Sequence, residues 1–188
     1  EDSVFGPNTD KIRALFEDQA GNLWVGTDGA GLKRLNQETG EFLHYGMVEE
    51  DANIVISIVE DLEGVLWIGT YAGLARFNSG NDQLELVSLE GDNPSRLKGY
   101  KVFGVHESQQ GTLWLGTLGG GLVNFDPVTQ EIISYPGQDQ LANRVIYGIL
   151  EAQDGRLWIS TNKGLIDLDP LTGKIKTYDS KDGLHSDE

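Results

Sequence analysis

The sequence contains no cysteine, few basic residues and no long apolar run. Without cysteine the chain forms neither disulfides nor thiolate metal sites. Its 14 Lys and Arg face 30 Asp and Glu, and the formal net charge of −16 argues against nucleic acid, whose phosphates attract basic side chains. No stretch approaches the ~18 consecutive apolar residues of a transmembrane helix, so we expect no membrane insertion in this segment.

Internal repetition is the main feature that the sequence does have. The four Trp residues lie 43, 47 and 44 residues apart, and each stands in the same phrase, Gly-x-Leu-Trp-apolar-Gly/Ser-Thr. Every Trp in the chain is used in this way, so coincidence is not a serious alternative. The four phrases span residues 21–27, 64–70, 111–117 and 155–161.

The match extends on both sides of each Trp phrase. An apolar run ending in Glu precedes it, and a Gly-Leu pair and a last apolar run follow it. Each unit therefore holds four short β-rich runs, a to d in chain order, separated by turn residues. Four antiparallel strands in ~45 residues are the size of a propeller blade. We predict an all-β fold, a β-propeller region over residues 1–188 with four four-stranded antiparallel blades at approximately 11–45, 54–87, 101–135 and 145–178.

The run around each Trp is apolar at nearly every position, which is typical of a strand buried on both faces of its sheet. Recurrence at one position inside such a strand indicates core residues between neighbouring blades and argues against exposed stacking platforms. The Glu that ends each strand a recurs as well, which indicates a structural hydrogen-bond acceptor near the a–b turn. The predicted structural core residues are Trp24, Trp67, Trp114 and Trp158, and the predicted acceptors are Glu17, Glu60, Glu107 and Glu151.

The repeat pattern, with Glu-Asp before the Trp phrase and Asp-Pro-x-Thr-Gly and Tyr after Gly-Leu, resembles the two-component regulator propeller repeat. In that family the repeats build the periplasmic sensor region of membrane-spanning bacterial signalling proteins, which end in a histidine kinase, often a hybrid one, or in a diguanylate cyclase. Some positions depart from the pattern. Ser160 replaces the usual Gly, and Ser108 and Ala152 replace the Asp found at Asp18 and Asp61. We interpret these departures as tolerated changes that say little about function.

The resemblance also implies a ring larger than four blades, so we expect this chain to be part of a larger propeller. Each unit runs from strand a to strand d, which leaves no split blade to latch a ring. A ring of four blades, an open arc and an end-to-end pair are all compatible with the sequence. We favour the pair, a homodimer through the terminal blades, because a closed symmetric ring of eight blades buries both apolar ends at once.

One face of the array is the candidate for recognition, since the start of strand a and the b–c hairpins meet there. Scaffold positions stay the same between repeats, whereas site positions differ. Aromatic, Arg and Asn side chains on one rim suit a small molecule, and the resemblance implies a saccharide as one ligand class. Ordinary variable surface is the alternative interpretation. The candidate ligand-binding residues are Arg13, Asp28, Asn53, Tyr71, Tyr100, Phe103, Arg144, Tyr147 and Asn162.

The sequence shows no catalytic set. The three His residues, at 44, 106 and 185, stand at non-equivalent repeat positions without metal-ligand spacing, and no Gly-x-Ser-x-Gly motif is present. The Gly-rich stretches 26–31 and 116–121 fall between strands, which indicates hairpins and not phosphate loops. We expect no metal, no cofactor and no enzyme activity in this segment.

The leading functional interpretation is a periplasmic, ligand-recognising sensor module of a bacterial signal-transduction protein. One alternative is a scaffold for protein–protein interaction or self-assembly, as in many propellers. The other is a propeller lyase or glycosidase, which would need paired carboxylates or a metal cluster at the axis.

Overall fold

The structure, a computed structural model, describes residues 11–87 and 100–184. It contains four four-stranded antiparallel sheets, each built from strands consecutive in the sequence, and this confirms the predicted all-β fold of four blades. Short helical turns, η1 (Glu50–Asn53), α1 (Gln138–Leu141) and η3 (Ser180–Asp182), flank the sheets. The strands are β1 (Ile12–Glu17), β2 (Leu23–Thr27), β3 (Leu32–Leu35) and β4 (Phe42–Tyr45) in blade 1; β5 (Val55–Glu60), β6 (Leu66–Thr70), β7 (Gly73–Asn78) and β8 (Gln83–Leu86) in blade 2; β9 (Lys101–Glu107), β10 (Leu113–Leu118), β11 (Leu122–Asp126) and β12 (Glu131–Ile133) in blade 3; and β13 (Ile146–Glu151), β14 (Leu157–Thr161), β15 (Gly164–Asp169) and β16 (Lys174–Tyr178) in blade 4.

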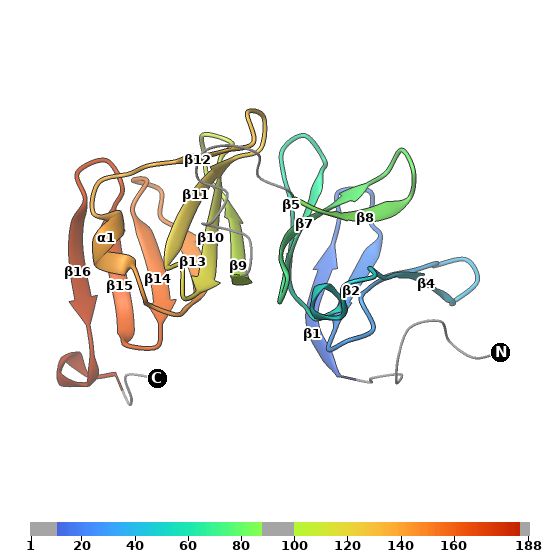
Figure 1. Cartoon of the computed structure of the whole chain (residues 1–188), viewed down its shortest axis with the longest axis horizontal. Helices are drawn as coiled ribbons and strands as arrows, with labels where there is room; N and C mark the ends of the chain where they lie inside the picture. The colour runs from blue at the N-terminus through green and yellow to red at the C-terminus, as the bar shows by residue number, and fades with distance from the viewer. Residues whose placement is uncertain (1–10, 88–99, 185–188) are drawn as a thin grey trace.

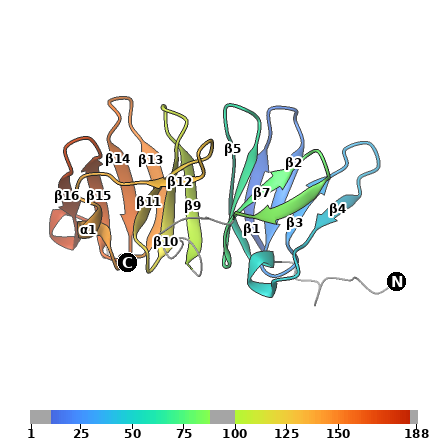
Figure 2. The same cartoon turned by 45° about the horizontal axis from the view of Figure 1, so that its top comes forward.

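The blades stand side by side in chain order, from blade 1 near the N-terminus to blade 4 near the C-terminus (Figures 1 and 2). Their first strands, β1, β5, β9 and β13, are neighbours in that order. Local chemistry sets the hairpins within each blade. At the turn after β15, for example, Asp169 Oδ1 accepts hydrogen bonds from the backbone N–H groups of Leu171 and Thr172, at 3.0 and 3.2 Å. Such Asx turns are a common way for Asp to reverse the chain.

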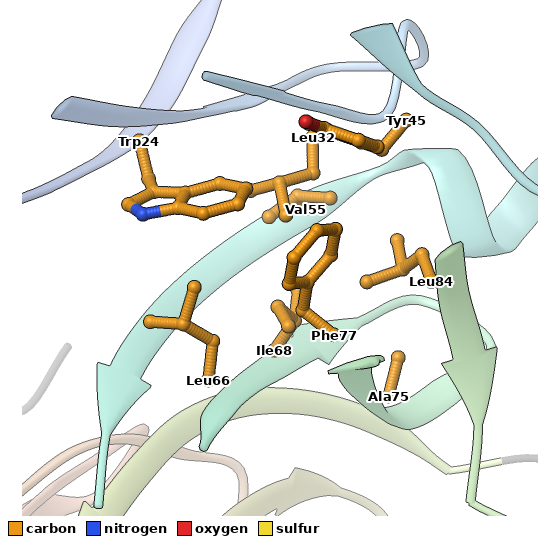
Figure 3. Close-up of a cluster of buried hydrophobic side chains, with 9 residues drawn as sticks. All are labelled: Trp24, Leu32, Tyr45, Val55, Leu66, Ile68, Ala75, Phe77 and Leu84. Atoms are coloured by element: carbon orange, nitrogen blue, oxygen red, sulfur yellow. The ribbon is translucent and has the colours of Figure 1, made fainter. Parts of the chain in front are cut away.

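The core lies between blades. In the cluster between blades 1 and 2, the indole of Trp24 packs against the Phe77 ring, with centroids 4.8 Å apart (Figure 3). Equivalent clusters join blade 2 to blade 3 through Trp67 and blade 3 to blade 4 through Trp114. The three Trp side chains are buried, as predicted for core residues. Burial of apolar area between sheets is therefore what holds consecutive blades together.

Glycine in the Trp phrase lets consecutive blades approach closely. A Cβ added to Gly26 would lie 2.6 Å from a methyl carbon of Val55 in the next blade, and a Cβ added to Gly116 would lie 2.6 Å from Ile146. Both distances are shorter than van der Waals contact. The phrase therefore keeps Gly where the first strand of the following blade rests on it.

In blades 2, 3 and 4, the Glu that ends strand a joins the blade to the one before it. The backbone N–H of Gln19 donates to Glu60 at 2.6 Å, and the N–H of Gln109 donates to Glu151 at 3.0 Å. Leu62 N–H bonds Glu107 in the same way. These carboxylates thus accept hydrogen bonds from backbone N–H groups in the a–b turn of the preceding blade, which is the acceptor role that the sequence predicted.

In the part of the chain that the structure describes, the outer faces of blades 1 and 4 have no neighbouring blade. Blades 1 and 4 lie at opposite ends (Figure 1), so the single chain forms an open row and not a closed four-bladed ring. Ile12 is 53% exposed although its counterpart Val55 is fully buried. Trp158 is only partly buried because no blade covers it there.

The packing predicts a difference between equivalent Trp residues. Trp67→Ala removes an interior contact and should lower the free energy of unfolding by about 3–5 kcal/mol. Trp158→Ala, on the uncovered face of blade 4, should cost less than half of that. Chemical denaturation of both variants measures the two values, and an equal loss would contradict the assignment of the core to the blade interfaces.

Candidate functional site

A β-bulge recurs near the start of strand a in every blade. In blade 1, Ile12 pairs with Thr27 and Ala14 with Gly26, so that Arg13 is the extra residue. The pairing skips one residue at the equivalent place in the other three blades. A bulge leaves its extra residue out of the ladder and re-aims the side chain, which frees this position to vary. We call the four bulge residues the bulge row: Arg13, Ile56, Phe103 and Tyr147.

Aromatic side chains connect the bulge row across three blades. The Phe103 ring lies 5.8 Å from the Tyr147 ring and 5.9 Å from the ring of Tyr71, which comes from the b–c hairpin of blade 2. Lys101 Nζ lies 3.8 Å from the centre of the Tyr71 ring, a cation–π contact. Tyr147 is 51% exposed, which makes it available to a ligand. We call Tyr71, Phe103 and Tyr147 the aromatic ladder.

An ion pair ends the bulge row in blade 1. Arg13 Nη2 lies 3.0 Å from Asp28 Oδ2, and Lys11 Nζ lies 3.8 Å from the same oxygen. The hydrogen bond from Arg13 lowers the pKa of the Asp28 carboxyl, so that Asp28 is ionised at neutral pH. The same hydrogen bond to Asp28 raises the pKa of Arg13. Cations and aromatic rings thus meet on a protein that is acidic as a whole.

The other predicted site residues mostly support the loops around the ladder. Asn53 is 8% exposed; its side chain accepts from Met47 N–H and donates to Met47 O, both at 2.8 Å. Asn162 Oδ1 accepts from Val145 N–H at 3.1 Å. Arg144 donates to the Lys163 carbonyl at 3.3 Å.

Tyr100 rests on the b–c hairpin of blade 3, because a Cβ on Gly120 would lie 3.0 Å from its ring. This Gly-rich stretch is a hairpin between β10 and β11, as predicted. The structure therefore brings Tyr71, Phe103 and Tyr147 together and pairs Arg13 with Asp28, while Tyr100 stands beside its own hairpin. Sequence reasoning missed Lys101, although a charged residue two positions before Phe103 was a signal.

Within residues 11–87 and 100–184, no group of three His, Asp or Glu side chains is placed to hold a metal ion. His185 lies outside these residues. In the same part of the chain, no helix has the length and apolar character needed to cross a membrane.

Four-stranded antiparallel sheets, packed face to face through a repeated Trp, define this chain as an array of β-propeller blades. More specifically, two segments of the chain, residues 6–29 and 140–163, match the model of the family described as "Two component regulator propeller". The chain is also 31% identical, over 174 residues, to histidine kinase P4 of Formosa agariphila. That match covers 88% of this chain and 13% of the kinase.

Solved structures share the fold. The extracellular domain of a putative hybrid two component system from B. thetaiotaomicron superimposes with a TM-score of 0.75 at 22% identity, over 96% of this chain and 25% of that one. Virginiamycin B lyase from Staphylococcus aureus superimposes with a TM-score of 0.67 at 15% identity, over 93% of this chain and 57% of the lyase. At these identities the likeness concerns the fold alone. The chain spans less than two thirds of the length of each of these proteins.

The geometry separates structural from exposed candidates, and stability measurements test this separation. Asn53→Ala leaves the backbone of Met47 without its partners and should lower the free energy of unfolding by about 1–3 kcal/mol. Tyr147→Ala, at an exposed position, should stay within about 0.5 kcal/mol of the wild type. Urea denaturation measures both, and a larger loss for Tyr147→Ala than for Asn53→Ala would reverse the two roles.

Proposed function

We propose that this chain is the non-catalytic sensor module of a bacterial signal-transduction protein and that it binds a small molecule on the aromatic ladder. The observation that carries the proposal is the ladder itself, three rings from three blades joined at 5.8–5.9 Å, with Lys101 Nζ over the Tyr71 ring. Exposed rings and a few directed polar groups are what small-molecule sites use for affinity and orientation.

The sensor role is supported by the repeat family and by the kinase that resembles this chain. A periplasmic location is part of the proposal, and the extracellular domain with the same fold supports it. The ladder spans more than one blade, so a ligand bound there contacts several blades at once and biases their relative positions. Such a differential contact is what a sensor needs to pass a signal to an output domain.

The chemistry of the rim favours binding over catalysis. Asp28, the carboxylate beside Arg13, is held in an ion pair with a lowered pKa, whereas a general acid at neutral pH needs a raised one. A lyase or glycosidase would need a differently tuned carboxylate. We therefore propose that this segment carries no enzyme activity.

Ligand binding can be tested with a panel of oligosaccharides and small metabolites, using thermal shift and then calorimetry. A ligand found in this way should bind Phe103→Ala and Tyr147→Ala at least tenfold more weakly, about 1.4 kcal/mol each. Tyr147→Phe, which keeps the ring, should retain most of the affinity. Val128→Ala, at an exposed position away from the ladder, is the control. Unchanged affinity in both ladder variants would remove the ladder from the site.

A second candidate function, self-assembly through the end blades, is favoured by unused groups that match each other. In the described residues the Glu17 carboxylate has no a–b turn to bond, and the Gln153 N–H, the counterpart of Gln109 N–H, has no carboxylate. Leu15 of blade 1 and Leu150 of blade 4 are 67% and 63% exposed, although their interior counterparts pack between blades. We propose that blade 4 receives blade 1 of a second copy through the contacts that join interior blades.

End-to-end pairing predicts a homodimer in which two such junctions close the ring. Light scattering at tens of micromolar should give twice the mass of the chain. Leu15→Asp should give a monomer with unchanged stability, because Leu15 is exposed in the single chain, whereas the control Val128→Asp should remain a dimer. A monomeric wild-type mass would exclude the pairing.

A further inference from the structure

At the rim that carries the aromatic ladder, two of the three blade junctions are held by backbone pairing. The b–c hairpin of blade 1 reaches blade 2, where Asp28 forms an antiparallel β-bridge with Ile54. Leu118, in the corresponding hairpin of blade 3, forms the same bridge with Val145 of blade 4. Backbone hydrogen bonds depend on distance and direction, so each bridge fixes the angle between the two blades that it joins.

The junction between blades 2 and 3 has no such bridge among the described residues. The b–c hairpin of blade 2 is one residue shorter, with residues 71–72 where blade 1 has 28–30. The Tyr71 N–H donates to the Ile54 carbonyl of its own blade at 3.2 Å. Across the junction Tyr71 contributes its ring, which lies under Lys101 Nζ of blade 3. At this rim, side-chain contacts therefore stand where the other two junctions have paired backbone.

The same junction also lacks a hydrogen bond at the other end of the strands. In the a–b turn of blade 1, Gln19 Nε2 donates to a backbone carbonyl of blade 2 at 3.5 Å, and Gln109 Nε2 of blade 3 donates to one of blade 4 at 3.2 Å. Blade 2 has Leu62 at this position, and its apolar side chain donates no hydrogen bond. The bond from the Leu62 N–H to Glu107 remains at this end of the junction.

A buried hydroxyl without a partner lies inside this junction. Ser57 Oγ makes no hydrogen bond within the described residues. A Cβ built on Gly69 would lie 2.3 Å from Ser57 Oγ and 2.7 Å from the Val102 carbonyl oxygen of blade 3, so the hydroxyl lies close to the blade interface. An unsatisfied buried hydroxyl costs free energy, which a change of blade angle that brings an acceptor within reach would recover. The other blades have Ala or Gly at this position, with no hydroxyl to satisfy: Ala14, Gly104 and Gly148.

Blades 2 and 3 are held together mainly by apolar contact. The Trp67 ring lies 5.9 Å from the Phe125 ring within the cluster that joins them. Apolar contact is non-directional, so it keeps two sheets together without fixing the angle between them. Within the pairs of blades 1–2 and 3–4, directional bonds at both ends of the strands do fix that angle. Figures 1 and 2 show these pairs as two groups, β1–β8 and β9–β16.

We propose that the junction between blades 2 and 3 is a joint, about which blades 1–2 and blades 3–4 rotate as two rigid bodies. The aromatic ladder crosses this joint, because Tyr71 lies on one side and Phe103 and Tyr147 lie on the other. A ligand that contacts Tyr71 and Phe103 together therefore favours one angle of the joint. The joint itself does not depend on a ligand, whereas this coupling to the ladder rests on the function proposed above.

Distances between pairs of spin labels measure the joint, and the lack of Cys in the chain lets two introduced Cys residues carry the labels. The exposed c–d turns offer one site in each blade: Glu38, Ser79, Val128 and Leu171. The pair S79C/V128C spans the joint, and E38C/S79C and V128C/L171C are the controls within the two rigid bodies. Labelled protein is diluted with unlabelled protein, so that only distances within one chain are read. The distance distribution across the joint should be about twice as wide as either control, because rotation of the two bodies adds to the local motion of the turns.

Leu62→Gln is the matched variant, since it gives blade 2 the side chain that Gln19 and Gln109 supply in blades 1 and 3. Leu62 is 75% exposed, so we expect the variant to fold as the wild type does. It should narrow the S79C/V128C distribution and leave both controls unchanged. An unchanged width would assign the breadth to the labelled turns and would overturn the joint, as would equal widths in all three label pairs.

A ligand found with the metabolite and oligosaccharide panel should also narrow the S79C/V128C distribution. If such a ligand binds the ladder and the width stays the same, the coupling is overturned while the joint stands. If the panel gives no ligand, the proposed binding function fails, and the width measured in the free protein still decides for or against the joint.

Discussion

The structure depends on one contact, the packing of the Trp face of each blade against the strands of the next. This contact requires a flat apolar sheet, a Gly where the following strand a rests, and a Glu that reaches back to the preceding turn. Each requirement is local to one interface, so it recurs at every interface and makes the sequence repetitive. Stability in such arrays is approximately a sum over repeats and their nearest-neighbour contacts.

Because the blades repeat one scaffold, a residue that departs from the repeat can be compared with its counterparts in the other blades. The bulge in strand a keeps the same backbone in all blades and leaves one side chain free to vary, and there the aromatic ladder forms. At the other end of the strands, blades 1 and 2 use Asp and Arg around their Trp, whereas blade 3 has Ser108 and Asn124.

Sequence reasoning could locate the rim but could not group its residues. Topology alone placed Tyr71 and Phe103 on one face, yet their ring contact depends on how closely blades 2 and 3 approach. Asn53 and Phe103 looked alike as variable positions. Only the hydrogen bonds from Asn53 to the Met47 backbone show that its side chain is occupied in the loop. Lys101 and Asn124 could be singled out only from the structure, which places them beside aromatic rings.

The sequence by itself determined the all-β class, the four blades, the interior Trp residues and the acceptor role of the Glu residues. Each of these follows from a requirement that repeats with the chain and therefore leaves a periodic signal. The tertiary structure alone decided that the single chain forms an open row, which rings form the ladder, and which junction lacks the backbone bridge that the other two have. These features arise from distances between blades. When a side chain departs from the repeat, the sequence does not show which residue of the neighbouring blade it faces, so the structure is needed to find its contacts.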